Sequence, residues 1–324
     1  MRHTPSPAPL ALAAIVLAGT RLALGADDLP PSKNVPPELF ATGFEWAEAP
    51  AFDQGGNLYV ANYRGNGNIG RITPDGAASV WCVLDQLAPV EGRHSRASGL
   101  KVDRAGRLVA ADAGAGRLLR IAPDGKKAEV LADRFEGSRF LAVHDVALDT
   151  KGNIYFTDAG SPTAENPSGC AYRFDIATAS VSRLVTGLAS PLGIGVSPDQ
   201  QHLCVSESLR YRILLYDLLD RNAVRPRVLI DFPRENVGEF RGGLFPPAGL
   251  TFDAAGRLYV AMGNGGVINV VDLASGRLLR QYDAGGGGAT NCHFSGPYLY
   301  VTVAAKEAVF RLRLGVSGFD YNRP

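Results

Sequence analysis

Two of the five histidines, His144 and His293, lie inside apolar, strand-like phrases of the chain. An imidazole titrates near neutral pH, so His144 could take a proton from a water molecule without a metal. Asp145 follows His144 directly, and Asn291 precedes His293 by two positions. In a strand with alternating side chains, Asn291 and His293 share one face and Cys292 takes the other. These positions predict proton transfer or substrate contact, provided that the fold brings them together.

Several other chemistries are excluded by their motifs. Ser98 has no G-x-S-x-G context, so it is not the nucleophile of a hydrolase elbow. The run Gly285–Gly288 lacks the Lys-Ser/Thr of a phosphate-binding loop. The recurring Asp-x-x-Gly phrases lack the spaced carboxylates of an EF-hand. The formal net charge of +1 gives no basic stripe, so we expect no nucleic-acid partner.

The four cysteines do not form a metal or redox motif. No C-x-x-C pair exists, and the four fall in different repeats: Cys82, Cys170, Cys204 and Cys292. Export would permit disulfides, and four cysteines allow three pairings. The spacing favours buried free thiols that act as small apolar residues.

A recurring phrase dominates the sequence. An Asp and a Gly, which favour a tight turn, are followed by a run rich in Leu, Tyr and Val, which favours a strand. Four copies are clear and two are looser, and their first apolar residues are Leu58, Leu108, Ile154, Leu203, Leu258 and Leu299. Further strands are predicted after each copy, for example over 118–121 and 128–131. Four strands per unit at this period predict an all-β, six-bladed β-propeller.

The ends of the chain give the predicted domain limits. Residues 1–26 have a weakly positive start, an apolar run and small residues near Ala23 and Gly25, which indicates a secretory signal peptide; an uncleaved membrane anchor is the alternative. Residues 27–37 are predicted to be a linker, 38–316 the propeller, and 317–324 a C-terminal tail. The last repeat lacks a fourth strand, so we expect the segment from Glu38 to Gly43 to supply it and close the ring. We expect a secreted or periplasmic protein with no membrane contact after cleavage.

The chain resembles the senescence-marker protein/gluconolactonase (regucalcin-like) family. The resemblance runs from about Glu38 to Leu314, and each phrase that carries it is weak alone. These are Trp46–Pro50, Ser98–Asp103, Ala132–Gly137, His144–Asp158, Pro191–Ile194, Pro247–Leu250 and Thr290–Phe294. The resemblance implies a lactonase or related esterase that holds one divalent metal, calcium or zinc, at the mouth of the propeller channel.

The resemblance implies site residues position by position, and the metal site has diverged. Glu48 keeps the family's Glu, whereas His144, Leu192 and Ala248 replace an Asn, an Asn and an Asp among the usual ligands. Leu and Ala offer no ligand atom, and Glu48 with His144 would need a third ligand to hold zinc. The predicted catalytic residues are Glu48, His144 and Asp145, and the predicted metal ligands are Glu48 and His144. The predicted substrate contacts are Ser98, Leu192, Ala248, Asn291 and His293.

Three functions follow from this reading. The first is a monomeric, gluconolactonase-like hydrolase that opens a sugar lactone or similar small ester, with or without a metal. The second is a binding module that has lost the metal, with Leu192 and Ala248 lining a pocket for a less polar ligand. The third is a metal-free enzyme similar to strictosidine synthase, in which Glu48 or Glu207 acts alone; no phrase specific to that family is present. The fold alone does not choose among the three.

Overall fold

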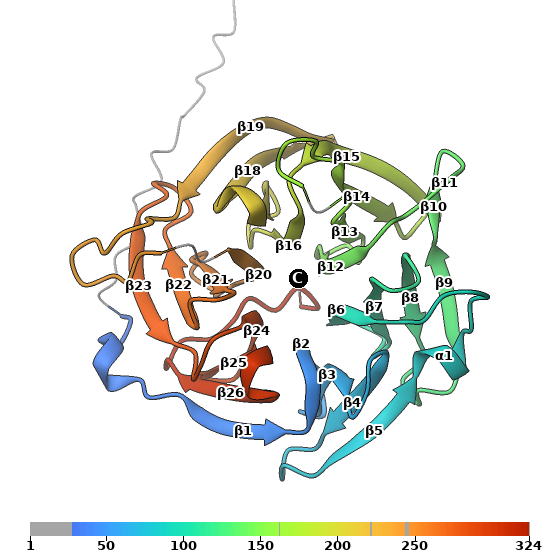
Figure 1. The fold of residues 1–324 in the computed structure, drawn as a ribbon, viewed down its shortest axis with the longest axis horizontal. Coiled ribbons are helices and arrows are strands. Elements are labelled where there is room, and N and C mark those ends of the chain that lie inside the picture. Colours follow the sequence, from blue (N-terminus) through green and yellow to red (C-terminus); the bar gives the residue numbers. More distant parts are fainter. Residues whose placement is uncertain (1–27, 162, 221, 244–245, 324) are drawn as a thin grey trace, which may run out of the picture.

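The computed structural model describes residues 28–161, 163–220, 222–243 and 246–323, so the predicted signal peptide lies outside the described residues. Six four-stranded antiparallel sheets surround a central channel, which confirms the predicted six-bladed propeller (Figure 1). Among the described residues, no helix is long and apolar enough to cross a membrane.

The blades follow one another along the chain, each from its inner to its outer strand. The first three blades are β2 (Phe44–Phe52), β3 (Leu58–Tyr63), β4 (Asn68–Ile72) and β5 (Ala78–Val83); β6 (Ala97–Val102), β7 (Leu108–Asp112), β8 (Arg117–Ile121) and β9 (Ala128–Ala132); β12 (Val143–Leu148), β13 (Ile154–Asp158), β14 (Gly169–Asp175) and β15 (Ser180–Leu188). The next two are β16 (Pro191–Val196), β17 (His202–Glu207), β18 (Arg212–Leu219) and β19 (Asn222–Asp231); β20 (Pro247–Phe252), β21 (Leu258–Met262), β22 (Val267–Val271) and β23 (Leu278–Asp283). The last contains β24 (Ala289–Ser295), β25 (Tyr298–Val303), β26 (Ala308–Arg313) and β1 (Glu38–Thr42).

Small elements occupy the connections between these strands. They are the helix α1 (Leu84–Leu87), the hairpin β10 (Arg134–Phe135) and β11 (Ser138–Arg139), and the 3-10 turns η1 (Ser32–Asn34), η2 (Ser208–Arg210) and η3 (Ala304–Lys306).

The N-terminal strand β1 is the outer strand of the last blade. It pairs antiparallel with β26, in a register that sets Glu38 opposite Arg311. The guanidinium Nε of Arg311 donates to a carboxylate oxygen of Glu38 at 2.9 Å. Strands from the two ends of the chain therefore share one sheet.

The recurring Asp-x-x-Gly phrase forms the turn between the first and second strands of a blade. In the first blade, the Oδ1 atom of Asp53 accepts a hydrogen bond from the Asn57 amide at 2.9 Å, and Gly56 has φ of +80°. The carboxylate thereby fixes the backbone, and the positive φ suits glycine. The same Asp-to-amide bond recurs at Asp103, Asp149 and Asp253. We call the face that carries these turns the lower face, and the opposite opening of the channel the upper mouth.

The core consists of apolar clusters packed between neighbouring blades. The cluster that joins the last two blades contains, for example, Tyr259, Tyr282 and Val301, all fully buried. All four cysteines are buried free thiols, as their spacing favoured.

Both flanking segments pack on the propeller. Within the predicted linker of residues 27–37, Leu29 and Val35 join an apolar cluster, and the Pro30 carbonyl accepts from the Tyr282 hydroxyl at 2.9 Å. The predicted tail crosses the lower end of the channel, and Figure 1 shows the C-terminus at the centre of the ring. There the Phe319 amide donates to the Phe252 carbonyl, and the Asn322 side chain donates to the Val102 carbonyl.

Candidate functional site at the upper mouth

The six inner strands begin around the upper mouth. All six depart from regular pairing there. In four of them the register shifts lie between Ala97 and Leu100, Val143 and Val146, Pro191 and Ile194, and Pro247 and Leu250. A bulge redirects the side chains within it, and such irregularities are common beside active sites. The predicted site residues Ser98, His144, Asp145, Leu192 and Ala248 all lie inside these irregular stretches.

Glycines allow the inner strands to approach each other closely. A Cβ atom on Gly99 would lie 2.5 Å from the Cα of Asp145, and one on Gly249 would lie 2.0 Å from the Asn291 side chain. Both contacts are far below van der Waals distance. The narrow channel therefore requires glycine next to Ser98 and Ala248, and it brings Asp145 and Asn291 to the channel centre.

Glu48 is a buried carboxyl on the inner strand β2. It is 7% exposed, and its Oε1 atom accepts a hydrogen bond from the indole Nε1 of Trp46 at 3.2 Å. Burial, with a smaller contribution from the negative charge of Asp145, raises the pKa of Glu48 to about 8. Glu48 is therefore protonated at neutral pH and can donate a proton.

His144 is a neutral imidazole on β12. Burial, and then the positive charge of Arg96, lower the pKa of His144 to about 4. At neutral pH the ring has a free nitrogen lone pair and can accept a proton. Glu48 and His144 are thus shifted in opposite directions, which is the usual signature of a paired acid and base.

Arg96 lies between these two groups, and sequence reasoning missed it. It directly precedes β6, which packs between β2 and β12. Its amide donates to Asp112 Oδ1 at 2.9 Å, its side chain is exposed, and its charge acts on both Glu48 and His144. Arg96 belongs to no motif, so only its place before an inner strand could have drawn attention to it.

Asp145 lies deeper and is saturated by hydrogen bonds. Its Oδ1 accepts from the Val146 amide at 2.9 Å and from Asn291 Nδ2 at 3.3 Å, and its Oδ2 accepts from the Ile194 amide at 3.4 Å. Burial raises the pKa of Asp145 to about 6, against the opposing charge of Lys101. These bonds tie three inner strands together, and the predicted catalytic role of Asp145 stays a prediction.

The other predicted substrate contacts separate into two levels. Ser98 and Ala248 are buried at the upper level, and Leu192 is half-buried there. Asn291 is 3% exposed and bonded to Asp145, whereas His293 lies farther down the channel in a small cavity with Lys101. The two residues therefore share the inner face of β24, but His293 is remote from the upper mouth. Their predicted contact with substrate stays a prediction.

The side chains of the channel that could bind a metal do not fit the divalent metal that the resemblance implies. Across residues 28–323, leaving aside the undescribed positions, no three His, Cys, Asp or Glu side chains gather around one point. Asp145 already accepts three N–H donors, and the side chains of Leu192 and Ala248 contribute no ligand atom. Hard divalent cations need several oxygen ligands, so we derive no step through a metal. The predicted metal ligation by Glu48 and His144 stays a prediction.

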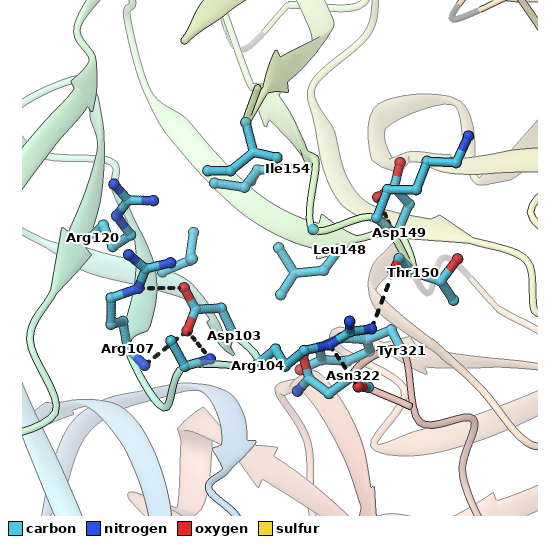
Figure 2. A pocket seen from close by; sticks show the side chains of 15 residues that line it. Asp103, Arg104, Arg107, Arg120, Leu148, Asp149, Thr150, Ile154, Tyr321 and Asn322 are labelled. Carbon is cyan, nitrogen blue, oxygen red and sulfur yellow. Dashed lines mark hydrogen bonds and ion pairs between the residues drawn. The ribbon is translucent and has the colours of Figure 1, made fainter. Parts of the chain in front are cut away.

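The lower face also carries hollows, one of which is shown in Figure 2. This hollow, of about 300 Å³, lies between the second and third blades and is lined by Arg104, Asp149 and Tyr321, among others. Arg104 crosses it, with its guanidinium donating to the carbonyls of Thr150 and Asn322. A similar hollow of about 300 Å³ lies between the third and fourth blades. Another, of about 430 Å³, lies beside the C-terminal segment and is lined by residues of four blades.

Comparison with known proteins shows that the chain is similar to proteins of the gluconolactonase family. Residues 85–305 match the family model described as "SMP-30/Gluconolactonase/LRE-like region". A gluconolactonase from Zymomonas mobilis is 25% identical over 301 residues, which cover 88% of this chain and 83% of the relative.

Two further matches extend the comparison. The protein STRICTOSIDINE SYNTHASE-LIKE 4 from Arabidopsis thaliana is 31% identical over 217 residues, covering 60% of this chain and only 56% of the plant protein. The solved structure of a calcium-binding regucalcin from Agrobacterium tumefaciens superposes with a TM-score of 0.70 at 18% identity, covering 88% of this chain and 95% of that one. At that identity the superposition supports the fold alone.

Proposed function

The chain belongs to the SMP-30/gluconolactonase/LRE-like family, and we propose that it is a lactone hydrolase acting on a small cyclic ester at the upper mouth of the channel. The observation that carries the proposal is the arrangement of Glu48, Arg96 and His144. They combine a protonated carboxyl, a cation and a neutral imidazole on three adjacent strands or strand starts. The gluconolactonase relative supports the substrate class.

Each group has a role in opening the ring. His144 accepts a proton from water as the water oxygen attacks the lactone carbonyl carbon. Arg96 stabilises the negative charge that develops on the carbonyl oxygen. Glu48 donates its proton to the ring oxygen as the acyl C–O bond breaks, and the products are a carboxylic acid and an alcohol on one chain.

Export completes the proposal, and metal assistance is the alternative that the assay must test. We propose that residues 1–26 direct the protein out of the cytoplasm, to the periplasm or the outside of the cell. If a divalent metal assists, Glu48 and His144 are the side chains that would hold it, and the metal would polarise the carbonyl. The hydrolysis assay therefore includes metal as a variable.

The direct test is hydrolysis of five- and six-carbon aldonolactones by the full chain, followed by acid release at constant pH. We expect turnover above the spontaneous rate in the presence of a chelator, with little change when calcium or zinc is restored. Turnover that depends strictly on added metal would replace the metal-free mechanism with a metal-assisted one. No turnover under any condition would reject the hydrolase and favour a binding module lined by Leu192 and Ala248.

The pH dependence should report the two opposite pKa shifts. Below about pH 4 His144 is protonated and cannot accept a proton, and above about pH 8 Glu48 has lost the proton that it must donate. We therefore expect kcat/KM to be bell-shaped, with limbs near pH 4 and pH 8 after subtraction of the spontaneous reaction. A profile that rises continuously to pH 9.5 would contradict Glu48 as the acid.

A further inference from the structure

The lower part of the channel contains a small cavity below Asp145. It has room of about 30 Å³ for a water-sized molecule, and Lys101, Thr251 and His293 line it from three different blades. Phe319 and Tyr321 of the C-terminal segment also line it, where that segment crosses the lower end of the channel. A water molecule needs about 10–15 Å³ of such room, so the cavity holds one or two small species.

Lys101 presents an unpaired cation to this cavity. It is 6% exposed, and its ammonium forms no hydrogen bond or ion pair with any described residue. Burial lowers the pKa of Lys101, even though the charge of Asp145 acts in the opposite direction. The negative charge of Asp145 therefore does not offset the cost of burying the Lys101 ammonium.

His293 supplies a second unpaired polar group. Its Nδ1 atom is buried without a hydrogen-bond partner among the described residues. Burial, and then the charge of Lys101, lower the pKa of His293 to about 3, so the ring is neutral and carries one N–H. The ring lies between Phe52 and Tyr321, with a centroid distance of 6.3 Å to each. Buried polar atoms without partners commonly indicate a water or an ion.

We propose that the lower channel binds one monatomic anion of about the size of chloride, held by the Lys101 ammonium and an N–H of His293. An anion accepts hydrogen bonds from both side chains and compensates the buried positive charge. A water molecule can accept the hydrogen bonds but does not compensate the charge. The room of about 30 Å³ is too small for sulfate, phosphate or a sugar, and Phe319 and Tyr321 of the C-terminal segment line it from below. The site is separate from the proposed hydrolase site, since Asp145 and Asn291 lie between them.

Thermal unfolding of the full chain tests the proposal. Sodium chloride and sodium bromide are compared with sodium isethionate at equal ionic strength, because isethionate is too large for the cavity. We expect the halides to raise Tm by about 2 °C or more, as for any ligand that binds only the folded state. Lys101→Met should abolish the difference between halide and isethionate. The control Lys151→Met, which removes an exposed lysine of the lower face, should retain it.

A second measurement covers the case in which Lys101→Met does not fold. Crystals of the unsubstituted chain grown in sodium bromide should show an anomalous peak inside the cavity, beside Lys101 and His293. Bromide confined to the outer surface would overturn the proposal. Equal Tm values in halide and isethionate, or a halide effect that persists in Lys101→Met, would overturn it as well.

Discussion

Glu48→Gln is expected to lower kcat for lactone hydrolysis by about 10²- to 10⁴-fold, the usual loss when a general acid is removed. Glutamine has nearly the same shape, and its side-chain oxygen can still accept from Trp46 Nε1, which donates to Glu48 at 3.2 Å. The amide cannot release a proton to the leaving oxygen. KM should change little, because the loss lies in the transition state.

The matched control for this substitution is Glu45→Gln, on the same strand but exposed to solvent. It makes the same side-chain substitution without touching the channel, and it should leave kcat unchanged. The free energy of unfolding should not fall in Glu48→Gln, because the substitution removes a buried group that is costly to ionise. If Glu48→Gln retained full kcat, Glu48 would not be the acid. If both variants lost activity equally, the loss would not come from the missing proton donor at position 48.

Arg257→Met is expected to reduce the free energy of unfolding by about 3–5 kcal/mol, because it leaves a buried carboxylate without its partner. Arg257 is 2% exposed and its Nε donates to Asp253, which is 1% exposed, at 2.6 Å. The same guanidinium also binds Asp28, which precedes the propeller in the sequence. Its loss therefore weakens the turn of the fifth blade and releases the N-terminal segment. Urea unfolding followed by circular dichroism measures the change.

The second blade offers a natural control in the same motif. Arg107 pairs with Asp103 at 2.8 Å in an equivalent turn, visible in Figure 2, but its side chain is 38% exposed. Arg107→Met should cost about 0–1 kcal/mol, since solvent screens an exposed pair. Similar losses in the two variants would show that burial does not decide the contribution of this turn.

The residues of the two proposed sites divide according to whether a motif marks them. Glu48 and His144 could be named from the sequence because they occupy positions in phrases that resemble a family pattern. Arg96 belongs to no such phrase, and Lys101 lies in the phrase Ser98–Asp103, where the resemblance gives it no role. Their importance comes from neighbours on other blades, Glu48 and His144 for Arg96, and His293 for Lys101. Electrostatic neighbours of this kind depend on how the blades are arranged in the ring.

The sequence by itself determined the blade repeat, because an Asp-x-x-Gly turn and the strand after it are fixed by hydrogen bonds within a few residues. Only the tertiary structure decided three other features: the level of His293 in the channel, the burial of Lys101, and the passage of the C-terminal segment across its lower end. The physical reason is that local turn chemistry repeats in every blade, whereas the burial and charge of each channel residue depend on strands from several blades. Glu48 and Asp145 illustrate the difference: both are acidic residues of apolar strands, and only their packing makes one a proton donor and the other a saturated acceptor.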